Sequence, residues 1–178
     1  MIGAIVALKS EAEILLDQME VFRSLTVSGK DVYVGQAFGK DTTVVVCGVG
    51  KVNAALGAQL AVSKFNAEKL FNFGVAGGLN KSTELCGVYQ IGAAVQFDFD
   101  LSEINGTEIG TLDEYSTPYF PLRTGGSFVR GTLATSDSFA SGNDDEALLR
   151  RLGADVRDME GAAIAHIAYA AKTPCFMF

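Results

Sequence analysis

Residues 42–56, TTVVVCGVGKVNAAL, contain the local pattern that decides the fold class. Residues 42–47 are rich in β-branched side chains, and Gly48 and Gly50 follow them directly. An Ala- and Leu-rich run with helical periodicity then continues to Lys64. A buried strand, a tight glycine turn and a helix account for this order. The stretch therefore predicts one strand–turn–helix unit of an α/β protein.

The same order recurs on both sides of this unit. Residues 2–8 (IGAIVAL) form an apolar run before Ser10 and Glu11, which are typical of a helix N-terminus. Residues 69–73 form another buried strand that ends in residues 74–79 (GVAGGL). We therefore expect three α/β/α layers around a central, mostly parallel but mixed sheet. Ligands of such sheets bind beyond the carboxyl ends of the strands.

The remaining segments are assigned by the same criteria. A hairpin is predicted for residues 32–38 and 42–47, because Gly39, Lys40 and Asp41 separate them. Further strands are expected at residues 88–97, 131–135 and 175–178, and helices at residues 143–152 and 158–171. Residues 98–123 are mostly polar and predict a long excursion, of a length that is uncommon unless it is functional.

Composition restricts the class of protein. The chain has 178 residues and a net charge of −7, which argues against binding to nucleic acid or to an anionic membrane surface. It contains no apolar run long enough to span a bilayer and no signal peptide. Cys47, Cys86 and Cys175 have neither metal-ligand spacing nor a disulfide pattern. We expect a soluble, cytoplasmic protein with one domain over residues 1–178, and no metal or cofactor.

Acidic residues near strand ends are the candidates for chemistry. Glu11 follows a strand end more closely than Glu13, and is the better candidate for a general base. Asp158 and Glu160 open an Ala-rich helix, where acids are ordinary partners of the helix dipole. A carboxylate beside small residues also suits a diol such as a ribose, and the local sequence leaves both interpretations open. His166, inside an apolar helix, is interpreted as a structural residue.

Two glycine turns are the other candidates. Gly48 and Gly50, and Gly74 with Gly77 and Gly78, allow a ligand to approach backbone amides closely. Tight strand–helix turns explain the same residues without any ligand. Neither turn has the dinucleotide fingerprint or the P-loop pattern.

Five separated motifs, read together, resemble the purine nucleoside phosphorylase superfamily, and most of all its methylthioadenosine/S-adenosylhomocysteine nucleosidases. The motifs are residues 7–13 (ALKSEAE), 48–55 (GVGKVNAA), 73–79 (FGVAGGL), 135–139 (TSDSF) and 158–163 (DMEGAA). They occur in the family's order and spacing and cover essentially the whole chain.

The resemblance implies a role for each matching residue. Glu11 would activate the attacking water, and Glu160 would bind the ribose hydroxyls with Met159 beside the sugar. Phe139 would stack on adenine, and the backbone of Ala140 would read the edge of the base. The remaining residues implied to line the substrate pocket are Val49, Val75, Ala76, Gly77 and Asp158.

Three departures from the family's pattern qualify these roles. Val75 stands where many nucleosidases have Ser or Thr, and Asp158 stands where Glu is usual. The family's general acid is an aspartate in a Ser-Asp pair after the strand that begins here at Cys175, and the printed sequence ends at Phe178. On this comparison the chain is expected to be C-terminally incomplete, without the last helix, and severely impaired in catalysis.

The expected activity is hydrolysis of the N-glycosidic bond of 5′-methylthioadenosine or S-adenosylhomocysteine, with release of adenine. The alternatives are a non-catalytic nucleoside-binding protein, and a nucleosidase or phosphorylase for another purine nucleoside such as futalosine. By resemblance we expect a homodimer, with Tyr115, Tyr119 or Phe120 at or near its interface. If these aromatic residues fold back on their own subunit instead, the chain is expected to be a monomer.

Overall fold

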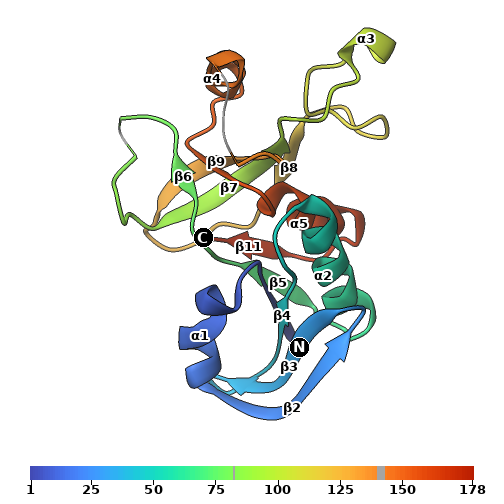
Figure 1. The fold of residues 1–178 in the computed structure, drawn as a ribbon, viewed down its shortest axis with the longest axis vertical. Helices are drawn as coiled ribbons and strands as arrows, with labels where there is room; N and C mark the ends of the chain where they lie inside the picture. Colours follow the sequence, from blue (N-terminus) through green and yellow to red (C-terminus); the bar gives the residue numbers. More distant parts are fainter. Residues whose placement is uncertain (82, 140–142) are drawn as a thin grey trace.

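The computed structural model describes residues 1–81, 83–139 and 143–178, and its ribbon is drawn in Figure 1. Strands and helices alternate along most of the chain. In chain order they are β1 (Ile2–Val6), α1 (Lys9–Asp17), β2 (Met19–Val27), β3 (Lys30–Ala37), β4 (Lys40–Val46), α2 (Lys51–Ser63), β5 (Lys69–Asn72), β6 (Gly77–Gly78), β7 (Tyr89–Gln96), α3 (Ser102–Asn105), β8 (Tyr119–Pro121), β9 (Val129–Thr135), α4 (Asn143–Arg151), β10 (Val156–Asp158), α5 (Gly161–Ala170) and β11 (Cys175–Met177).

The strands form two mixed sheets. The first has the order β11-β5-β1-β4-β3-β2, and the second has the order β6-β10-β9-β7-β8. β1 pairs in parallel with β4 and β5, and β9 pairs in parallel with β7 and β10. Antiparallel pairs join β2 to β3, β3 to β4, β6 to β10 and β7 to β8. The predicted α/β class with mixed pairing is confirmed, but backbone pairing divides the strands into two sheets where one was expected.

Helices cover both faces of these sheets, which gives three layers (Figure 1). α2 and α5 pack against each other, and their cluster includes Ile5 and Val45 of the first sheet and Leu133 and Val156 of the second. α1 covers the opposite face of the first sheet, and α4 packs against the second sheet. The shared core under α2 and α5 therefore holds the two sheets together.

β1 shows why a short apolar run forms the centre of the first sheet. Ala4 and Val6 point to the cluster under α1, whereas Ile5 points to the cluster under α2 and α5. This alternation is the period of two that a strand imposes on its side chains. On the α2 side, a methyl group at Gly57 would lie 2.7 Å from Cβ of Cys47. Gly57 thus lets α2 approach the end of β4 closely.

Three elements differ from the sequence-based prediction. Residues 19–27, for which the sequence pattern predicts no element, form β2, whose side chains are mostly exposed at the sheet edge. The helix expected from Asp158 begins at Gly161, because Asp158 ends β10. The excursion at residues 98–123 is not wholly irregular, since it contains α3 and β8. The predicted hairpin is confirmed, with a shorter connection at Phe38 and Gly39.

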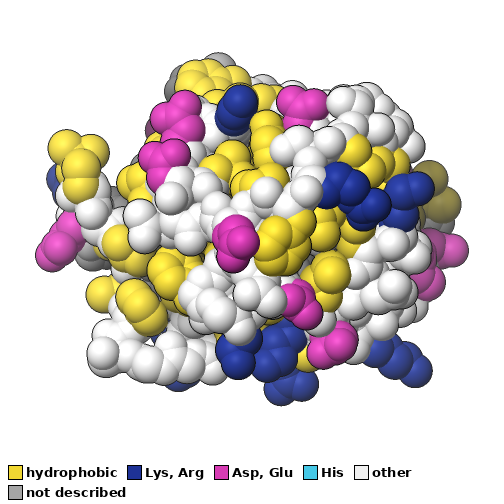
Figure 2. All heavy atoms as spheres, turned by 90° about the horizontal axis from the view of Figure 1, so that it is seen from below, with side chains coloured by type: hydrophobic (Ala, Val, Ile, Leu, Met, Phe, Trp, Pro, Cys, Tyr) yellow, Lys and Arg dark blue, Asp and Glu magenta, His cyan; other side chains and the backbone are white. Residues whose placement is uncertain are grey.

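The end of the molecule formed by α1, β2 and β3 is shown as spheres in Figure 2. Hydrophobic side chains lie there among acidic and basic ones (Figure 2). Exposed apolar residues of these elements and of the β3–β4 turn are Ile14, Val21, Phe22 and Phe38. Within residues 1–81, 83–139 and 143–178, none of the helices has both the length and the apolar character needed to cross a membrane.

Candidate active site

The loops that follow parallel strands of both sheets meet at one place. Glu11 follows β1 and accepts a hydrogen bond from the backbone N–H of Val75, which follows β5. Glu160 follows β10 of the second sheet and accepts one from the N–H of Gly50, which follows β4 of the first sheet. The carboxyl ends of the strands are where open α/β sheets bind ligands. The structure therefore brings the two predicted carboxylates to that edge.

Glu11 lies in the first turn of α1, and the backbone holds its carboxylate at two points. The N–H of Leu8 donates to Oε2 at 2.9 Å, and the N–H of Val75 donates to Oε1 at 3.1 Å. A methyl group at Gly74 would lie 2.7 Å from Oε1, so the glycine makes room for the carboxylate. Each carboxylate oxygen keeps a second lone pair that is able to accept a proton from water. Glu13, the weaker candidate, is exposed.

Glu160 is held by the glycine turn that precedes α2. The N–H of Gly50 donates to Oε1 of Glu160 at 2.6 Å. Gly48 and Gly50 have φ angles of 88° and 98°, in the region that glycine adopts readily and other residues avoid. The glycines noted in the sequence are thus required by the backbone conformation of this turn. That conformation presents a helix N-terminus to a carboxylate, which the helix dipole favours.

The charges of the two glutamates act on common neighbours. Burial raises the pKa of Glu160, and the charges of Glu11 and Asp137 raise it further. Burial also raises the pKa of the Cys47 thiol to about 12, and the charges of Glu160 and Glu11 both contribute. The charges of both carboxylates therefore act on the Cys47 thiol, and that of Glu11 acts on Glu160. Cys47 itself is a buried, protonated thiol under the site.

Asp158 has a structural position. Its Oδ1 accepts a hydrogen bond from the hydroxyl of Thr135, and its Oδ2 accepts one from the N–H of Gly161 at 2.6 Å. The Thr135 hydroxyl in turn accepts the N–H of Ala162 at 2.9 Å. Burial raises the pKa of Asp158 to about 6, although these hydrogen bonds lower it. Both carboxylate oxygens thus bind groups that fix the start of α5 and so the direction of Glu160.

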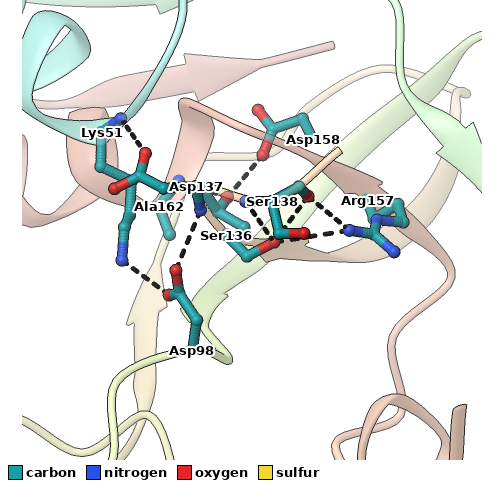
Figure 3. Close-up of polar contacts among 9 residues, drawn as sticks. Lys51, Asp98, Ser136, Asp137, Ser138, Arg157, Asp158 and Ala162 are labelled. Atoms are coloured by element: carbon teal, nitrogen blue, oxygen red, sulfur yellow. Dashed lines mark hydrogen bonds and ion pairs between the residues drawn. The ribbon is translucent and has the colours of Figure 1, made fainter. Parts of the chain in front are cut away.

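A second network, which the sequence analysis did not identify, joins three loops (Figure 3). Nζ of Lys51 lies 2.6 Å from Oδ1 of Asp98, and the N–H of Asp137 donates to Oδ2 of Asp98 at 2.9 Å. The N–H of Lys51 donates to Oδ1 of Asp137 at 2.8 Å. Asp98 follows β7, Asp137 follows β9, and Lys51 begins α2. The one feature of the sequence that points to Asp98 is its position directly after a predicted strand.

Arg157 of β10 holds the same loop from its other side (Figure 3). Its guanidinium donates to the carbonyl of Ser138 at 2.7 Å and to the hydroxyl of Ser136 at 3.4 Å. The guanidinium also lies 5.4 Å from the ring centre of Phe97, a distance typical of a cation–π contact. The loop of residues 136–138 is therefore tied to β10 as well as to β7 and α2.

The other predicted pocket residues are distributed as follows. Phe139 and Val75 are 89% and 87% exposed, and Val49 is 45% exposed. Ala76 and Gly77 are exposed, whereas Met159 is half-buried. The structure thus places Val49 and Val75 in the turns that hold Glu160 and Glu11, and Ala76 and the first residue of β6, Gly77, follow Val75; all four are open to solvent. Ala140 lies outside the described residues, so its predicted role stays a prediction.

The aromatic residues of the excursion fold back on their own chain. Phe120 is 2% exposed, and its ring stacks on His166 at 4.8 Å. Tyr115 contacts both of these rings edge-on, and the hydroxyl of Tyr119 donates to the carbonyl of Leu152 at 3.1 Å. Burial lowers the pKa of His166. The interpretation of His166 as a packed helix residue agrees with these contacts.

Two further observations concern ligands. A hollow of about 330 Å³ lies between the start of α2 and α5, and its lining includes Val52, Asp137 and His166. In the part of the chain that the structure describes, His, Cys, Asp and Glu side chains form no group of three or more suited to a metal ion. Polar groups of the site are bound to one another and to the backbone, through the contacts given above.

Comparison with known proteins agrees with this architecture. The family model described as "Phosphorylase superfamily" matches residues 1–178. The 5′-methylthioadenosine/S-adenosylhomocysteine nucleosidase of Listeria monocytogenes serotype 4a (strain HCC23) is 30% identical over 190 residues, which cover 97% of this chain and 82% of that protein. The chain therefore belongs to the phosphorylase superfamily and, within it, to the family of 5′-methylthioadenosine/S-adenosylhomocysteine nucleosidases.

Solved structures show the same fold. The nucleosidase of Colwellia psychrerythraea 34H in complex with adenine superimposes with a TM-score of 0.90 at 28% identity, over 99% of this chain and 79% of that chain. The S-adenosylhomocysteine nucleosidase of Streptococcus pyogenes with 5-methylthiotubericidin gives 0.89 at 26% identity, over 99% and 80%. A futalosine hydrolase mutant of Helicobacter pylori strain 26695 gives 0.91 at 24% identity, over 99% and 86%, and at that identity shares the fold alone.

Proposed function

We propose that the protein hydrolyses the N-glycosidic bond of a 5′-modified adenosine, namely 5′-methylthioadenosine or S-adenosylhomocysteine, and releases adenine. One observation supports this most directly. Glu11 and Glu160 come from different sheets, and backbone amides hold both at the carboxyl ends of the strands. Two oriented carboxylates at this edge of the sheets suit a reaction that passes through a cationic sugar.

In the proposed reaction Glu11 is the general base. A water molecule forms a bond to the anomeric carbon while the bond from that carbon to the purine nitrogen breaks. One proton of the water goes to a free lone pair of the Glu11 carboxylate and the other stays on the new sugar hydroxyl, while the purine leaves with the bonding electrons and takes up a proton from solvent. Glu160 binds the ribose hydroxyls, and its negative charge stabilises the cationic sugar. Met159, half-buried beside it, contacts the sugar.

Water is favoured over phosphate as the nucleophile. Phosphate would need cationic side chains and amides that converge on it. Here the carboxylate of Glu11 occupies the turn after β1 and has already bound the N–H groups of Leu8 and Val75. Asn72, which precedes the other turn, is buried and donates its side-chain amide to the carbonyl of Ile5 at 2.9 Å. A negative charge at this place repels phosphate and suits the activation of water.

A coupled assay for adenine tests the proposal. The protein is incubated with 5′-methylthioadenosine, and with S-adenosylhomocysteine, in buffer with and without inorganic phosphate. Release of adenine that does not depend on phosphate is the expected result. A requirement for phosphate, with a sugar 1-phosphate as the product, would identify a phosphorylase. Binding of the nucleosides without any adenine release would favour a non-catalytic binding protein.

We also propose that residues 1–178 form one nucleoside phosphorylase-like domain and that two copies associate. Val52, 81% exposed, and Val49 lie at the start of α2 beside the site, which supports a contact there. Phe120 packs against its own chain, the arrangement for which a monomer was the expected alternative, so the proposed dimer rests on the exposed Val52 and Val49 and not on that ring. Sedimentation at micromolar concentration is expected to give a dimer, and a clean monomer of about 19 kDa would contradict it.

The three cysteines support a location in the cytoplasm. Cys47, Cys86 and Cys175 are free thiols, and proteins that mature in oxidising compartments more often form disulfides. Fractionation of cells that express the tagged protein is expected to recover it with cytoplasmic enzymes.

A further inference from the structure

We infer that Asp98 is a positioning residue that fixes the loop of residues 136–139 for recognition of the purine base. The inference rests on the proposed function, because it assumes that Phe139 stacks on that base. The loop follows β9 and leads directly to Phe139. The Phe139 side chain is exposed, so packing contacts of its own do little to fix its position. What fixes the ring must therefore act on the backbone before it.

Asp98 acts on that backbone and on a cation together. One carboxylate oxygen accepts the N–H of Asp137 at 2.9 Å, and the other contacts Nζ of Lys51 at 2.6 Å. The side chain of Lys51 is only 15% exposed, so water screens this pair less than it does a surface ion pair. Both oxygens are needed, since each one binds a different donor.

Lys51, Asp98 and Asp137 form a closed ring of contacts, and its second half runs through Asp137. Its carboxylate accepts the N–H of Lys51 at 2.8 Å, next to Gly50, whose own N–H holds Glu160. α2 has no side-chain cap of its own at Gly50, so Asp137 supplies a bond that the start of the helix otherwise lacks. Figure 3 shows the ring closed, with Lys51, Asp98 and Asp137 facing one another. The loop for the base and the turn for the ribose are thus joined at α2.

The variant Asp98→Asn tests this arrangement, because the amide keeps the size of the side chain but leaves one acceptor oxygen for two donors. We expect the dissociation constant for free adenine to rise about tenfold, the effect of losing one charge-assisted hydrogen bond. The KM for the nucleoside is expected to rise with it, whereas kcat changes less. Asp100→Asn is the matched control, since the exposed carboxylate of Asp100 binds the backbone N–H and the side chain of Ser102 within its own turn.

A second variant separates positioning from general damage. In Asp98→Asn/Lys51→Met the competing cation is gone, so the single amide oxygen is free to accept the N–H of Asp137. The double variant is therefore expected to bind adenine more tightly than Asp98→Asn alone. A merely structural role for Asp98 predicts the opposite, because removing two members of the ring would then do more harm than removing one.

Amide hydrogen exchange supplies a readout that needs no substrate. The amide of Asp137 is expected to be protected in the unaltered protein and in Asp100→Asn, and to exchange faster in Asp98→Asn. Equal exchange in all three proteins, or adenine binding by Asp98→Asn as tight as by Asp100→Asn, would overturn the inference. If the unaltered protein neither binds adenine nor cleaves nucleosides, the proposed function fails, and the base-positioning role fails with it. In that case hydrogen exchange still decides separately whether Asp98 holds the loop.

Discussion

The N–H of Gly50 donates a 2.6 Å hydrogen bond to Oε1 of Glu160, a residue that lies 110 positions further along the chain and follows a strand of the other sheet. This bond orients the carboxylate that we assign to the ribose. It also means that the glycine turn and the acidic motif, two separate features of the sequence, form one unit in the fold. Substitutions at Glu160 should therefore affect the sugar and spare the base.

Glu160→Ala is expected to weaken the binding of a nucleoside analogue and to leave the binding of free adenine nearly unchanged. A hydrogen bond between a charged group and a hydroxyl contributes about 1.5–3 kcal/mol, which corresponds to roughly a 10- to 100-fold change in affinity. Calorimetry with both ligands measures the difference. Equal losses for adenine and for the nucleoside would mean that Glu160 serves only to hold the Gly50 turn.

Glu11→Gln is expected to reduce adenine release by about 10²–10⁴-fold, because a general base contributes that much. Nucleoside binding should change little, since the amide keeps the shape of the side chain. The amide also loses an acceptor for one of the N–H groups of Leu8 and Val75, so thermal unfolding has to be measured beside the rate. Cleavage at nearly the normal rate would remove Glu11 from the mechanism.

Gly74→Ala tests the position of the general base, Glu11, without changing the chemistry of its carboxylate. The new methyl group would lie 2.7 Å from Oε1 of Glu11 and must displace that carboxylate. A shift of about 1 Å in a catalytic group costs roughly 10²-fold in rate. Stability should fall little, because the displaced atoms are the end of a flexible side chain. Gly125→Ala is the control, since its methyl group would meet open space; similar rates for both variants would contradict the assignment.

The elements that the sequence predicted correctly are those marked by a local run of apolar residues that ends in a turn. β1, β4 with α2, and β5 alternate apolar runs with glycine turns, and these patterns are local. β2 escaped prediction because most of its side chains are exposed at an edge, where the sheet imposes little alternation of apolar and polar residues. The sequence predicts Asp158 in a helix because acids commonly begin helices, whereas in the structure it binds the N–H of Gly161 from the end of β10.

The parts of the candidate site that lie within a single sequence motif were predictable. Glu11 and Glu160 stand beside glycine turns in the sequence, and their positions follow from the rule for strand ends. The ring of Lys51, Asp98 and Asp137 was not predictable, because its members are 47 and 86 positions apart and meet only where loops of both sheets converge. The resemblance implied Tyr115, Tyr119 or Phe120 at or near a dimer interface, and of these the Phe120 ring is buried against His166 of its own chain.

The buried carboxyl of Asp158 should leave a signature in the pH dependence of stability. Its pKa is raised from 3.8 to about 6, first of all by burial. Below pH 3.8 the group is protonated in both the folded and the unfolded chain. As the pH rises toward 6 the unfolded chain releases this proton while the folded chain retains it, so the contribution of Asp158 to the free energy of unfolding falls, and above about 6 it is constant.

Asp158→Asn should remove this falling component, because the amide does not ionise. Urea unfolding at several pH values between 4 and 7 measures it as the difference between the slopes of the variant and of the unaltered protein. Asp100→Asn is again the control, since hydrogen bonds from Ser102 lower the pKa of Asp100 and its contribution has the opposite sign. Some loss of stability in Asp158→Asn is expected at every pH, because one of its two hydrogen-bond donors then faces an amide N–H. A slope identical to that of the unaltered protein would show that Asp158 is ionised at the start of α5 throughout this range, and that its carboxylate is solvated better than its contacts with Thr135 and Gly161 indicate.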